Sequence, residues 1–327
     1  MQAKQDPVVA AVLELFPGAY ITEIIPHAEE TAPMDFTPTN VSPTSFSDAF
    51  QALLDEAHQI HNMEQEPRDY LGGSRLGVEC DRALAYEYFQ VAKDPDRNFK
   101  GKILRIFDMG HDGEDRMAEY IRRAGFTLLT HRSDGQQFGF GVAPDPVTGK
   151  SRIAGHIDGI LTDGPEYVGC TKMTYPCLWE NKGLNDKGSK GCVKKGVKEE
   201  KPIYYAQMQI YMAYLGLGDN PGLFTALNRN TGDIHSELVP FDAQAAQQAS
   251  DRGVRVIRAD SPEDLPRIAR ESTDFRCKFC DYAARCWGAA EPQAAAPVPA
   301  PLFGAQPAAP VTAPAAPGTN WLKNANS

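Results

Sequence analysis

Two short segments of the chain carry acidic and basic side chains whose spacing suits metal-dependent hydrolysis. Asp158 lies within the alternating apolar segment Arg152–Leu161, and Glu180 and Lys182 stand two residues apart further along the chain. Because strand side chains alternate between faces, we expect Glu180 and Lys182 on one face, and pairing of the two segments would place Asp158 beside Glu180. An ordinary ion pair between Glu180 and Lys182 is the alternative.

A packed pair of carboxylates needs positive charge nearby. Two unit charges about 4 Å apart repel each other by roughly 4 kcal/mol at an effective dielectric of 20, which favours a cation beyond one lysine ammonium. Carboxylate and carbonyl oxygens favour Mg²⁺ or Mn²⁺ over zinc. The sequence therefore predicts a divalent metal between Asp158 and Glu180.

Two helical segments offer further polar side chains. Gly110 and Glu114 are four residues apart, which places both on one helix face, with the glycine leaving room for close approach. Gln207 and Tyr211 have the same spacing and could hold a phosphate or orient Lys182. A solvated face for Glu114 and a half-buried polar edge for Gln207 and Tyr211 are the alternatives.

The charge of the chain limits how it could bind a polyanion. Lysine and arginine number 33 against 43 acidic residues, a formal net charge of -10, so a nucleic-acid role requires a local basic patch. The segment Lys187–Lys198 is rich in glycine and lysine and is predicted to be a loop along which a phosphate backbone could pass. A solvated basic surface is the alternative.

The cysteines form a second constellation. Cys277 and Cys280 make a C-x-x-C pair, Cys286 follows after five residues, and Cys80 is the natural fourth ligand for zinc or an iron–sulfur cluster. The alternative for Cys80 is a small buried hydrophobic residue. The other three cysteines are expected to be of that kind; they are Cys170, Cys177 and Cys192.

Composition divides the chain into three parts. Residues 1–45 form an N-terminal segment with a short amphipathic stretch at 7–16 and a linker at 31–44; residues 46–290 suit one α/β domain; and residues 291–327 form an Ala/Pro-rich tail that is predicted to be disordered. Trp321 near the end of the tail indicates either a docking peptide for a protein partner or an incidental terminus. No run of 18 apolar residues or secretory signal occurs, so we expect no membrane span and a reducing, cytoplasmic location.

Periodicity predicts helices followed by short strands. The expected helices are 46–54, 74–88, 105–124, 203–215 and 243–258, and the expected strands are 126–131, 136–142, 152–161 and 177–183, with a hairpin of 222–228 and 233–240.

In order along the chain, these residues resemble a known nuclease group. Glu114, Asp158, the Glu180-Asn181-Lys182 triplet and the Gln207–Tyr211 pair are similar to the motifs of the PD-(D/E)xK nuclease superfamily in its RecB-like branch. Cys80 with the late C-x2-C-x5-C resembles its iron–sulfur exonucleases, such as the CRISPR-associated and AddB-type members. The segment 71–82 is similar to the opening of phage-encoded exonucleases, and the resemblance spans about residues 71–287. Many RecB-like members have histidine where this chain has Glu114.

The resemblance implies a restriction-endonuclease-like mixed sheet flanked by helices, with a cysteine-bound cluster joining the early and late parts of the domain. It implies that Asp158, Glu180, the Asn181 carbonyl and Glu114 hold Mg²⁺ or Mn²⁺. Lys182 would position and help deprotonate the attacking water. Gln207 and Tyr211 would steady Lys182 and the DNA backbone. A 4Fe-4S cluster, with zinc as the alternative, would be held by Cys80, Cys277, Cys280 and Cys286.

The implied activity is that of a metal-dependent DNA exonuclease in phage-type recombination, replication or degradation, acting in the host cytoplasm if phage-encoded. A non-catalytic nucleic-acid-binding module on a nuclease scaffold is the main alternative. A zinc-stapled interaction protein is a third interpretation.

Overall fold

A computed structural model describes residues 43–288 of this protein. It divides the chain into two units between Leu54 and Asp55, inside helix α2 (Pro43–Glu64), and the account below concerns the second unit. The predicted amphipathic segment 7–16, most of the linker 31–44 and the tail with Trp321 lie outside the described residues. The domain limits at 45 and 290 stay predictions. No helix within residues 43–288 is long and apolar enough to cross a membrane.

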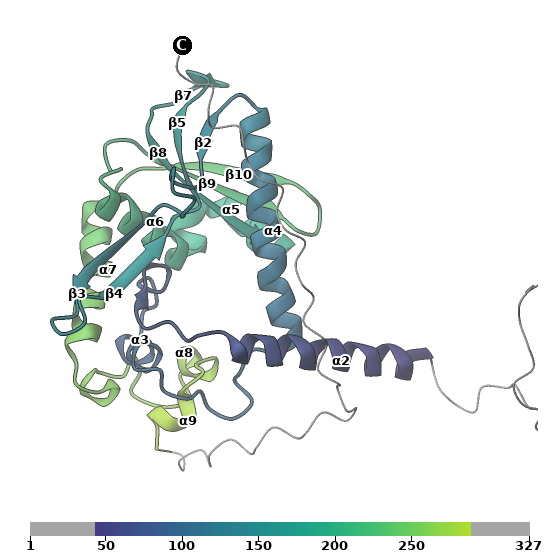
Figure 1. Cartoon of the computed structure of the whole chain (residues 1–327), viewed down its shortest axis with the longest axis vertical. Coiled ribbons are helices and arrows are strands. Elements are labelled where there is room, and N and C mark those ends of the chain that lie inside the picture. The colour runs from purple at the N-terminus through teal and green to yellow at the C-terminus, as the bar shows by residue number, and fades with distance from the viewer. Residues whose placement is uncertain (1–42, 289–327) are drawn as a thin grey trace, which may run out of the picture. The chain divides into compact units, whose positions relative to one another are not determined.

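The second unit is a mixed α/β structure (Figure 1). A five-stranded sheet has the order β10-β9-β8-β5-β2, in which β8 and β9 are parallel and the other neighbours are antiparallel. A three-stranded sheet has the order β1-β4-β3, and β6 pairs with β7. The strands are β1 Leu71–Gly72, β2 Thr127–Leu129, β3 Gly139–Pro144, β4 Ser151–His156, β5 Gly159–Asp163, β6 Tyr167–Val168, β7 Thr171–Lys172, β8 Cys177–Leu184, β9 Gly222–Asn228 and β10 Ile234–Val239.

Helices cover the central strand β8. The helices of this unit, besides the end of α2, are α3 Asp81–Tyr88, α4 Gly101–Arg123, α5 Asp186–Glu200, α6 Pro202–Leu215, α7 Ala243–Arg258, α8 Phe275–Lys278 and α9 Ala283–Cys286, with short 3-10 turns at Gly73–Arg75 and Pro262–Asp264. Trp179 of β8 packs with Met117 and Ile121 of α4, whereas Leu178 belongs to the core that Met208 and Ile210 of α6 help to form. The alternating residues of β8 therefore serve two cores.

The predicted strand 152–161 is two strands in two different sheets. β4 ends at His156 in the three-stranded sheet and β5 begins at Gly159 in the five-stranded sheet, so Ile157 and Asp158 form the crossing between them. Ile157 is buried like a strand residue, which explains why the apolar alternation continues through the break. The break places Asp158 at the junction of the two sheets.

Two other predictions were wrong. The helix expected from Ser74 is a 3-10 turn over Gly73–Arg75, and α3 begins only at Asp81, with Cys80 as its N-cap residue. The Gly- and Lys-rich segment expected to be a loop is helix α5, whose Asn185 side chain accepts a hydrogen bond from Gly188 N at 2.8 Å as its N-cap. α5 is bent at Gly196, where φ is 78°.

Candidate active site

Glu180 and Lys182 share one face of β8, as their spacing predicts. The Lys182 ammonium donates a hydrogen bond to Glu180 Oε1, and it also donates to the Asn181 backbone carbonyl at 2.9 Å. The Glu180 side chain is 0% exposed. The Asn181 side chain lies among buried groups, where its Oδ1 accepts from the Thr225 hydroxyl at 2.9 Å. Only the backbone of Asn181 thus contributes to this cluster.

Asp158 joins this pair from the junction between the sheets. The expected pairing of its segment with β8 is confirmed, because β5 runs antiparallel to β8 with Gly159 opposite Trp179. Asp158 Oδ2 accepts a hydrogen bond from Asn181 N at 2.7 Å and lies 3.8 Å from the Lys182 ammonium. Two carboxylates and one ammonium therefore meet at the point where the chain leaves one sheet for the other.

Helix α6 supplies the next layer of contacts. Gln207 Nε2 donates to Glu180 Oε1 at 2.5 Å. The Lys182 ammonium lies 5.5 Å from the centre of the Tyr204 ring, within the range of a cation–π interaction. Tyr204 was not identified from the sequence, although its position three residues before Gln207 places both on one helix face.

Tyr211 approaches the same cluster from further along α6. Its ring is buried edge-on against Phe140, with 5.6 Å between centroids. A Cβ atom at Gly155 would lie 2.8 Å from the Tyr211 ring, so glycine there allows the ring to pack. Burial raises the pKa of Tyr211, and the charge of Glu180 raises it further. Among the described residues, Tyr211 makes no hydrogen bond to Lys182.

Glu114 of α4 lies near the other carboxylates. Burial raises the pKa of Glu114 to about 7, the Asp158 charge raises it as well, and Lys182 opposes the shift. Nothing in the described chain lies within 4 Å of a Cβ built on Gly110, one turn before Glu114. Gly110 thus leaves open space beside Glu114.

The electrostatics of the cluster favour added positive charge. Burial raises the pKa of Glu180 to about 8, and Asp158 raises it further against the effect of Lys182. Burial alone would lower the pKa of Lys182, but Glu180 and Asp158 raise it above its ordinary value. The shifts reflect one ammonium shared among three carboxyl groups.

One observation indicates that a divalent cation could bind at these residues. Glu180 Oε2 is buried and has no hydrogen-bond partner among the described residues, and an unpartnered buried carboxylate oxygen is costly unless a donor or a metal satisfies it. Within residues 43–288, however, no three Asp, Glu, His or Cys side chains are arranged to hold one metal ion. In this arrangement the Lys182 ammonium, rather than a third carboxylate, completes the cluster.

The basic segment after β8 is largely neutralised by neighbouring carboxylates. Lys190 pairs with Asp186 at 2.7 Å and Lys198 with Asp242 at 3.1 Å. Lys195 lies 3.4 Å from Glu200. These pairs belong to helix α5 and its surroundings, so the predicted basic loop is a helix surface of mixed charge.

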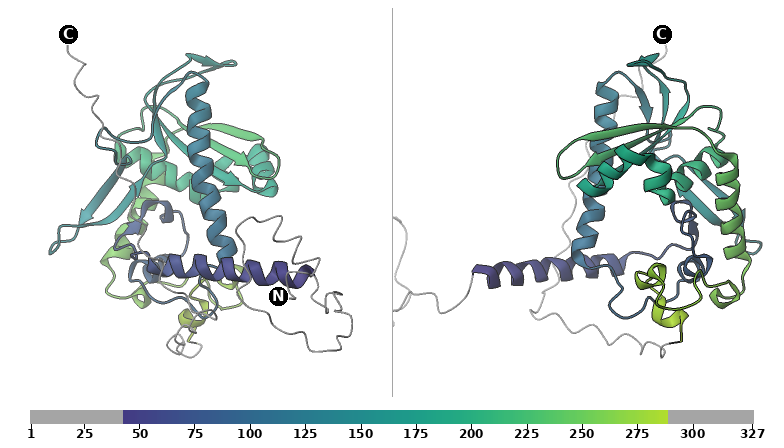
Figure 2. Two further views of the ribbon diagram at one scale, coloured as in Figure 1. Left: turned by 45° about the vertical axis from the view of Figure 1, so that its right-hand side comes forward. Right: turned by 180° about the vertical axis from the view of Figure 1, so that it is seen from behind.

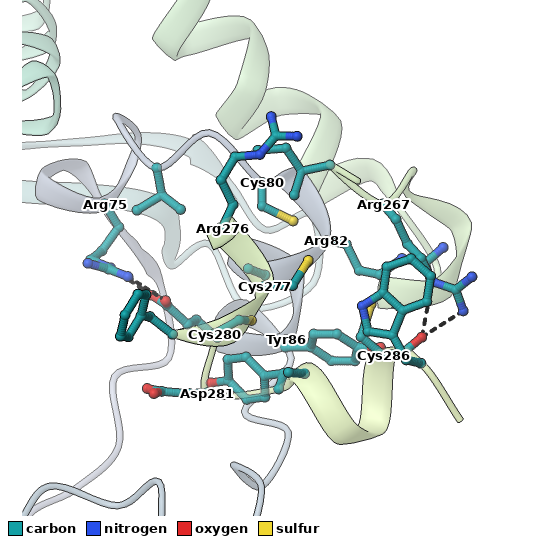
Figure 3. Close-up of a pocket in the computed structure, with 18 residues that line it drawn as sticks. Arg75, Cys80, Arg82, Tyr86, Arg267, Arg276, Cys277, Cys280, Asp281 and Cys286 are labelled. Carbon is teal, nitrogen blue, oxygen red and sulfur yellow. Dashed lines mark hydrogen bonds and ion pairs between the residues drawn. The ribbon is translucent and has the colours of Figure 1, made fainter. Parts of the chain in front are cut away.

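Four cysteines from distant parts of the chain line one pocket of about 240 Å³ (Figure 3); they are Cys80, Cys277, Cys280 and Cys286. Burial raises the pKa of Cys280, and the other three thiols raise it further, which shows that the sulfurs lie close to one another. Of the remaining cysteines, Cys177 and Cys192 are buried as expected, but Cys170 is exposed.

Polar contacts connect the late part of the chain, including its cysteine segment, with α3 and the loop that follows it. The Asp94 carboxylate accepts from the backbone N–H groups of Ala284 and Arg285, and Arg82 donates to the Leu265 carbonyl at 2.7 Å. Arg267 donates twice to the Cys286 carbonyl and lies over the Trp287 ring. The thiols are therefore held together by the surrounding fold.

The comparisons with known proteins are distant. No protein-family model matches the chain, and no curated protein matches it. Among solved structures, the chain is similar to SSO0001 with 15% identity and a TM-score of 0.39, over 72% of this chain and 96% of that one. It is also similar to an alkaline exonuclease, LHK-Exo, from Laribacter hongkongensis, with 16% identity and a TM-score of 0.35, over 62% of this chain and 92% of that one.

Proposed function

We propose that this chain is a metal-dependent nuclease that hydrolyses phosphodiester bonds in DNA, as an exonuclease with a restriction-endonuclease-like fold. The observation that carries the proposal is the state of Glu180. It is fully buried, Lys182 and Gln207 both donate to its Oε1, its Oε2 has no partner among residues 43–288, and Asp158 lies beside Lys182. A structural ion pair needs no second carboxylate and no unsatisfied oxygen.

Mg²⁺ or Mn²⁺ would be held by Asp158, Glu180 and the Asn181 carbonyl, with Glu114 alongside. When bound, the ion would act as a Lewis acid toward the phosphate. Lys182, kept protonated by its two carboxylates, would donate to a phosphate oxygen and offset the negative charge that develops during attack by water. Lys182 would also position the attacking water and help to deprotonate it, as the family resemblance implies. Glu114 would orient the attacking water.

Around this centre, Gln207 would fix the orientation of the Glu180 carboxylate, and Tyr204 would confine the Lys182 ammonium. Tyr211 would support the DNA backbone near Lys182.

We also propose that Cys80, Cys277, Cys280 and Cys286 hold a 4Fe-4S cluster that acts as a structural staple. Thiolates suit both zinc and iron–sulfur clusters. The resemblance of the cysteine spacing to that of iron–sulfur exonucleases favours the cluster over a single zinc ion.

The test is incubation of purified full-length protein with linear and circular DNA, with and without Mn²⁺. We expect Mn²⁺-dependent loss of linear DNA, and no cleavage by Asp158→Ala or Lys182→Ala variants that keep the far-ultraviolet circular dichroism of the wild type. Lys150→Ala, which removes an exposed lysine from an ion pair with Asp69 outside the site, is the control and should cleave normally. Full activity of the Asp158 or Lys182 variant would refute the site, and DNA binding without cleavage would favour the non-catalytic module.

A further inference from the structure

One stripe of helix α4 changes from core to surface along its length. Residues three, four and seven apart lie on one helix face, and this stripe consists of Ile103, Phe107, Gly110, Glu114, Met117 and Ile121. At its later end, Met117 is 2% exposed and Ile121 is 9% exposed, packed with Trp179. At its earlier end, Ile103 is 38% exposed and Phe107 is 44% exposed. The apolar pattern thus continues beyond the core that residues 43–288 form.

The uncovered part of the stripe leads away from the candidate active site. In Figures 1 and 2 the first half of α4 extends beyond the five-stranded sheet that its second half covers. Phe107 precedes Glu114 by seven residues, so it lies about 10.5 Å away along the axis at 1.5 Å per residue, and on nearly the same face. Gly110 lies between them with open space around it.

The exposed ring of Phe107 is held in place. Phe99 packs against it edge-on, with 5.1 Å between centroids, and the Lys93 ammonium lies 3.9 Å from the centre of the Phe99 ring. Arg105, which projects from another face of α4, pairs with Asp55 at 2.5 Å. Contacts on other sides therefore fix α4 and leave one face of the stripe open.

A cation links this surface with the site. Arg229 is exposed, lies against Gly183 next to Lys182, and donates to the Ile106 carbonyl next to Phe107 at 3.4 Å. A phosphate backbone that passes from the carboxylates toward Phe107 would meet this guanidinium. Proteins bind single-stranded nucleic acid with aromatic rings that stack on bases and with cations that neutralise phosphates, and Phe107 and Arg229 would supply one of each.

We infer that the surface formed by Ile103, Phe107 and Gly110, here called the base platform, stacks an unpaired nucleobase of the strand whose phosphate reaches Glu114 and Lys182. The inference rests on the proposed function, and it makes single-stranded or frayed DNA the substrate class. Inside a duplex both faces of each base are already stacked on neighbouring pairs, and a blunt end exposes only the outer face of its last pair. An unpaired strand can present a base face to Phe107 at any position close to the cleaved bond.

The experiment compares two ligands that differ only in their bases. Full-length protein in Ca²⁺ is titrated by fluorescence anisotropy against oligothymidylate and against an abasic strand of equal length, about 12 nucleotides, within the usual range of site sizes. We expect Phe107→Ala to weaken binding of oligothymidylate about tenfold, which is about 1.4 kcal/mol, and to leave binding of the abasic strand unchanged. Phe107→Trp should keep the wild-type preference, and Ile103→Ala should show a smaller loss in the same direction.

Tyr120→Ala is the matched control, because Tyr120 lies on α4 outside the stripe and is 46% exposed. It should change neither affinity. The base platform would be overturned if Phe107→Ala weakened the binding of both ligands equally or of neither. A change in sedimentation without a change in base preference would overturn it as well. The proposed function fails separately: a wild-type protein that shows the base preference but leaves DNA intact with Mn²⁺ is a binder and not a nuclease.

Discussion

At the scale of single residues, Glu180 is a group whose burial costs stability and whose chemistry suits a functional site. A carboxylate fully removed from water is expensive even when it is paired, and here one of its oxygens has no partner in the described part of the chain. Burial and Asp158 both raise its pKa, so the charged form of Glu180 is costly in this cluster. Such a group is expected where a ligand restores the balance.

Gln207 and Gln209 allow a paired test of this interpretation. Both are buried on α6, but Gln207 donates to Glu180 whereas Gln209 donates to the Pro240 carbonyl and accepts from Asp242 N. We expect Gln207→Ala to lower Mn²⁺-dependent cleavage 10- to 100-fold, roughly the effect of removing a group that orients a metal ligand. Gln209→Ala should lower the melting temperature with little change in cleavage by the folded protein. Equal cleavage rates of the two variants would contradict the role of Gln207.

At the scale of elements, Asp242 joins three helices. Its carboxylate caps α7 by accepting from Ala245 N at 3.0 Å, and it also accepts from Tyr205 of α6 and Lys198 of α5. The Ala245 N–H and the side chains of Lys198 and Tyr205 lower the pKa of Asp242 to about 2. The charged form is therefore favoured in the folded protein.

The consequence is a pH-dependent part of the free energy of unfolding. Because the folded pKa lies below the unfolded value, this stabilisation is present above about pH 4 and is lost as the pH falls toward 2. We expect Asp242→Ala to cost about 1 kcal/mol at neutral pH, as for other N-caps, and to weaken the fall in stability between pH 4 and 2.

Asp242→Asn keeps an N-cap acceptor but removes the charge. It should retain most of the stability at pH 7 and lose the same part of the acid dependence, measured by urea unfolding across that pH range. An unchanged acid dependence in both variants would show that Asp242 contributes nothing to it.

The elements also show how far sequence reasoning reaches. Periodicity predicted α4 and α7 well because each buries a stripe of apolar residues against the rest of the fold, whereas α6 was predicted although its residues 207–212 are all buried. Alternation correctly placed Glu180 and Lys182 on one face. Alternation could not reveal the break between β4 and β5, because Ile157 is buried in the observed structure just as it would be in one continuous strand. Periodicity missed α5 because its glycines disfavour a helix, whereas Gly191 is required where the Glu200 side chain crosses it.

At the scale of the whole molecule, contacts between the early and late parts of the chain surround the cysteine pocket. Arg82 reaches the Leu265 carbonyl, Arg252 and Arg255 both pair with Asp81, and Tyr86 stacks on Tyr282. These contacts place Cys80 beside the three late cysteines without any covalent bond. A cluster bound there would stabilise the fold chiefly by holding these segments together.

Cys80→Ser tests this staple sharply. Cys80 is the N-cap of α3 and makes no side-chain cap hydrogen bond, whereas serine is a good N-cap, so the substitution should improve the end of the helix. We nevertheless expect loss of bound iron, of absorbance near 400 nm (about the region for thiolate–iron charge transfer), and of soluble yield after anaerobic purification.

Cys170→Ser is the control, since Cys170 is exposed and lies outside the pocket. It should keep iron, colour and yield. Zinc instead of iron in the purified wild-type protein would show that the pocket binds zinc and not a 4Fe-4S cluster. A Cys80→Ser protein that lacks metal but is as stable as the wild type would refute the structural role of the cluster.

The Asp94 contacts also have a consequence for how the protein is made. Asp94 binds the backbone of Ala284, a partner that emerges from the ribosome 190 residues later. At about 5–20 residues per second, on the order of ten to forty seconds pass between the synthesis of Asp94 and that of Ala284. For most of that interval Cys80 has been synthesised and the other three cysteines of the pocket have not. Assembly of the proposed cluster would consequently be a late event, one that a stalled or prematurely terminated chain never reaches.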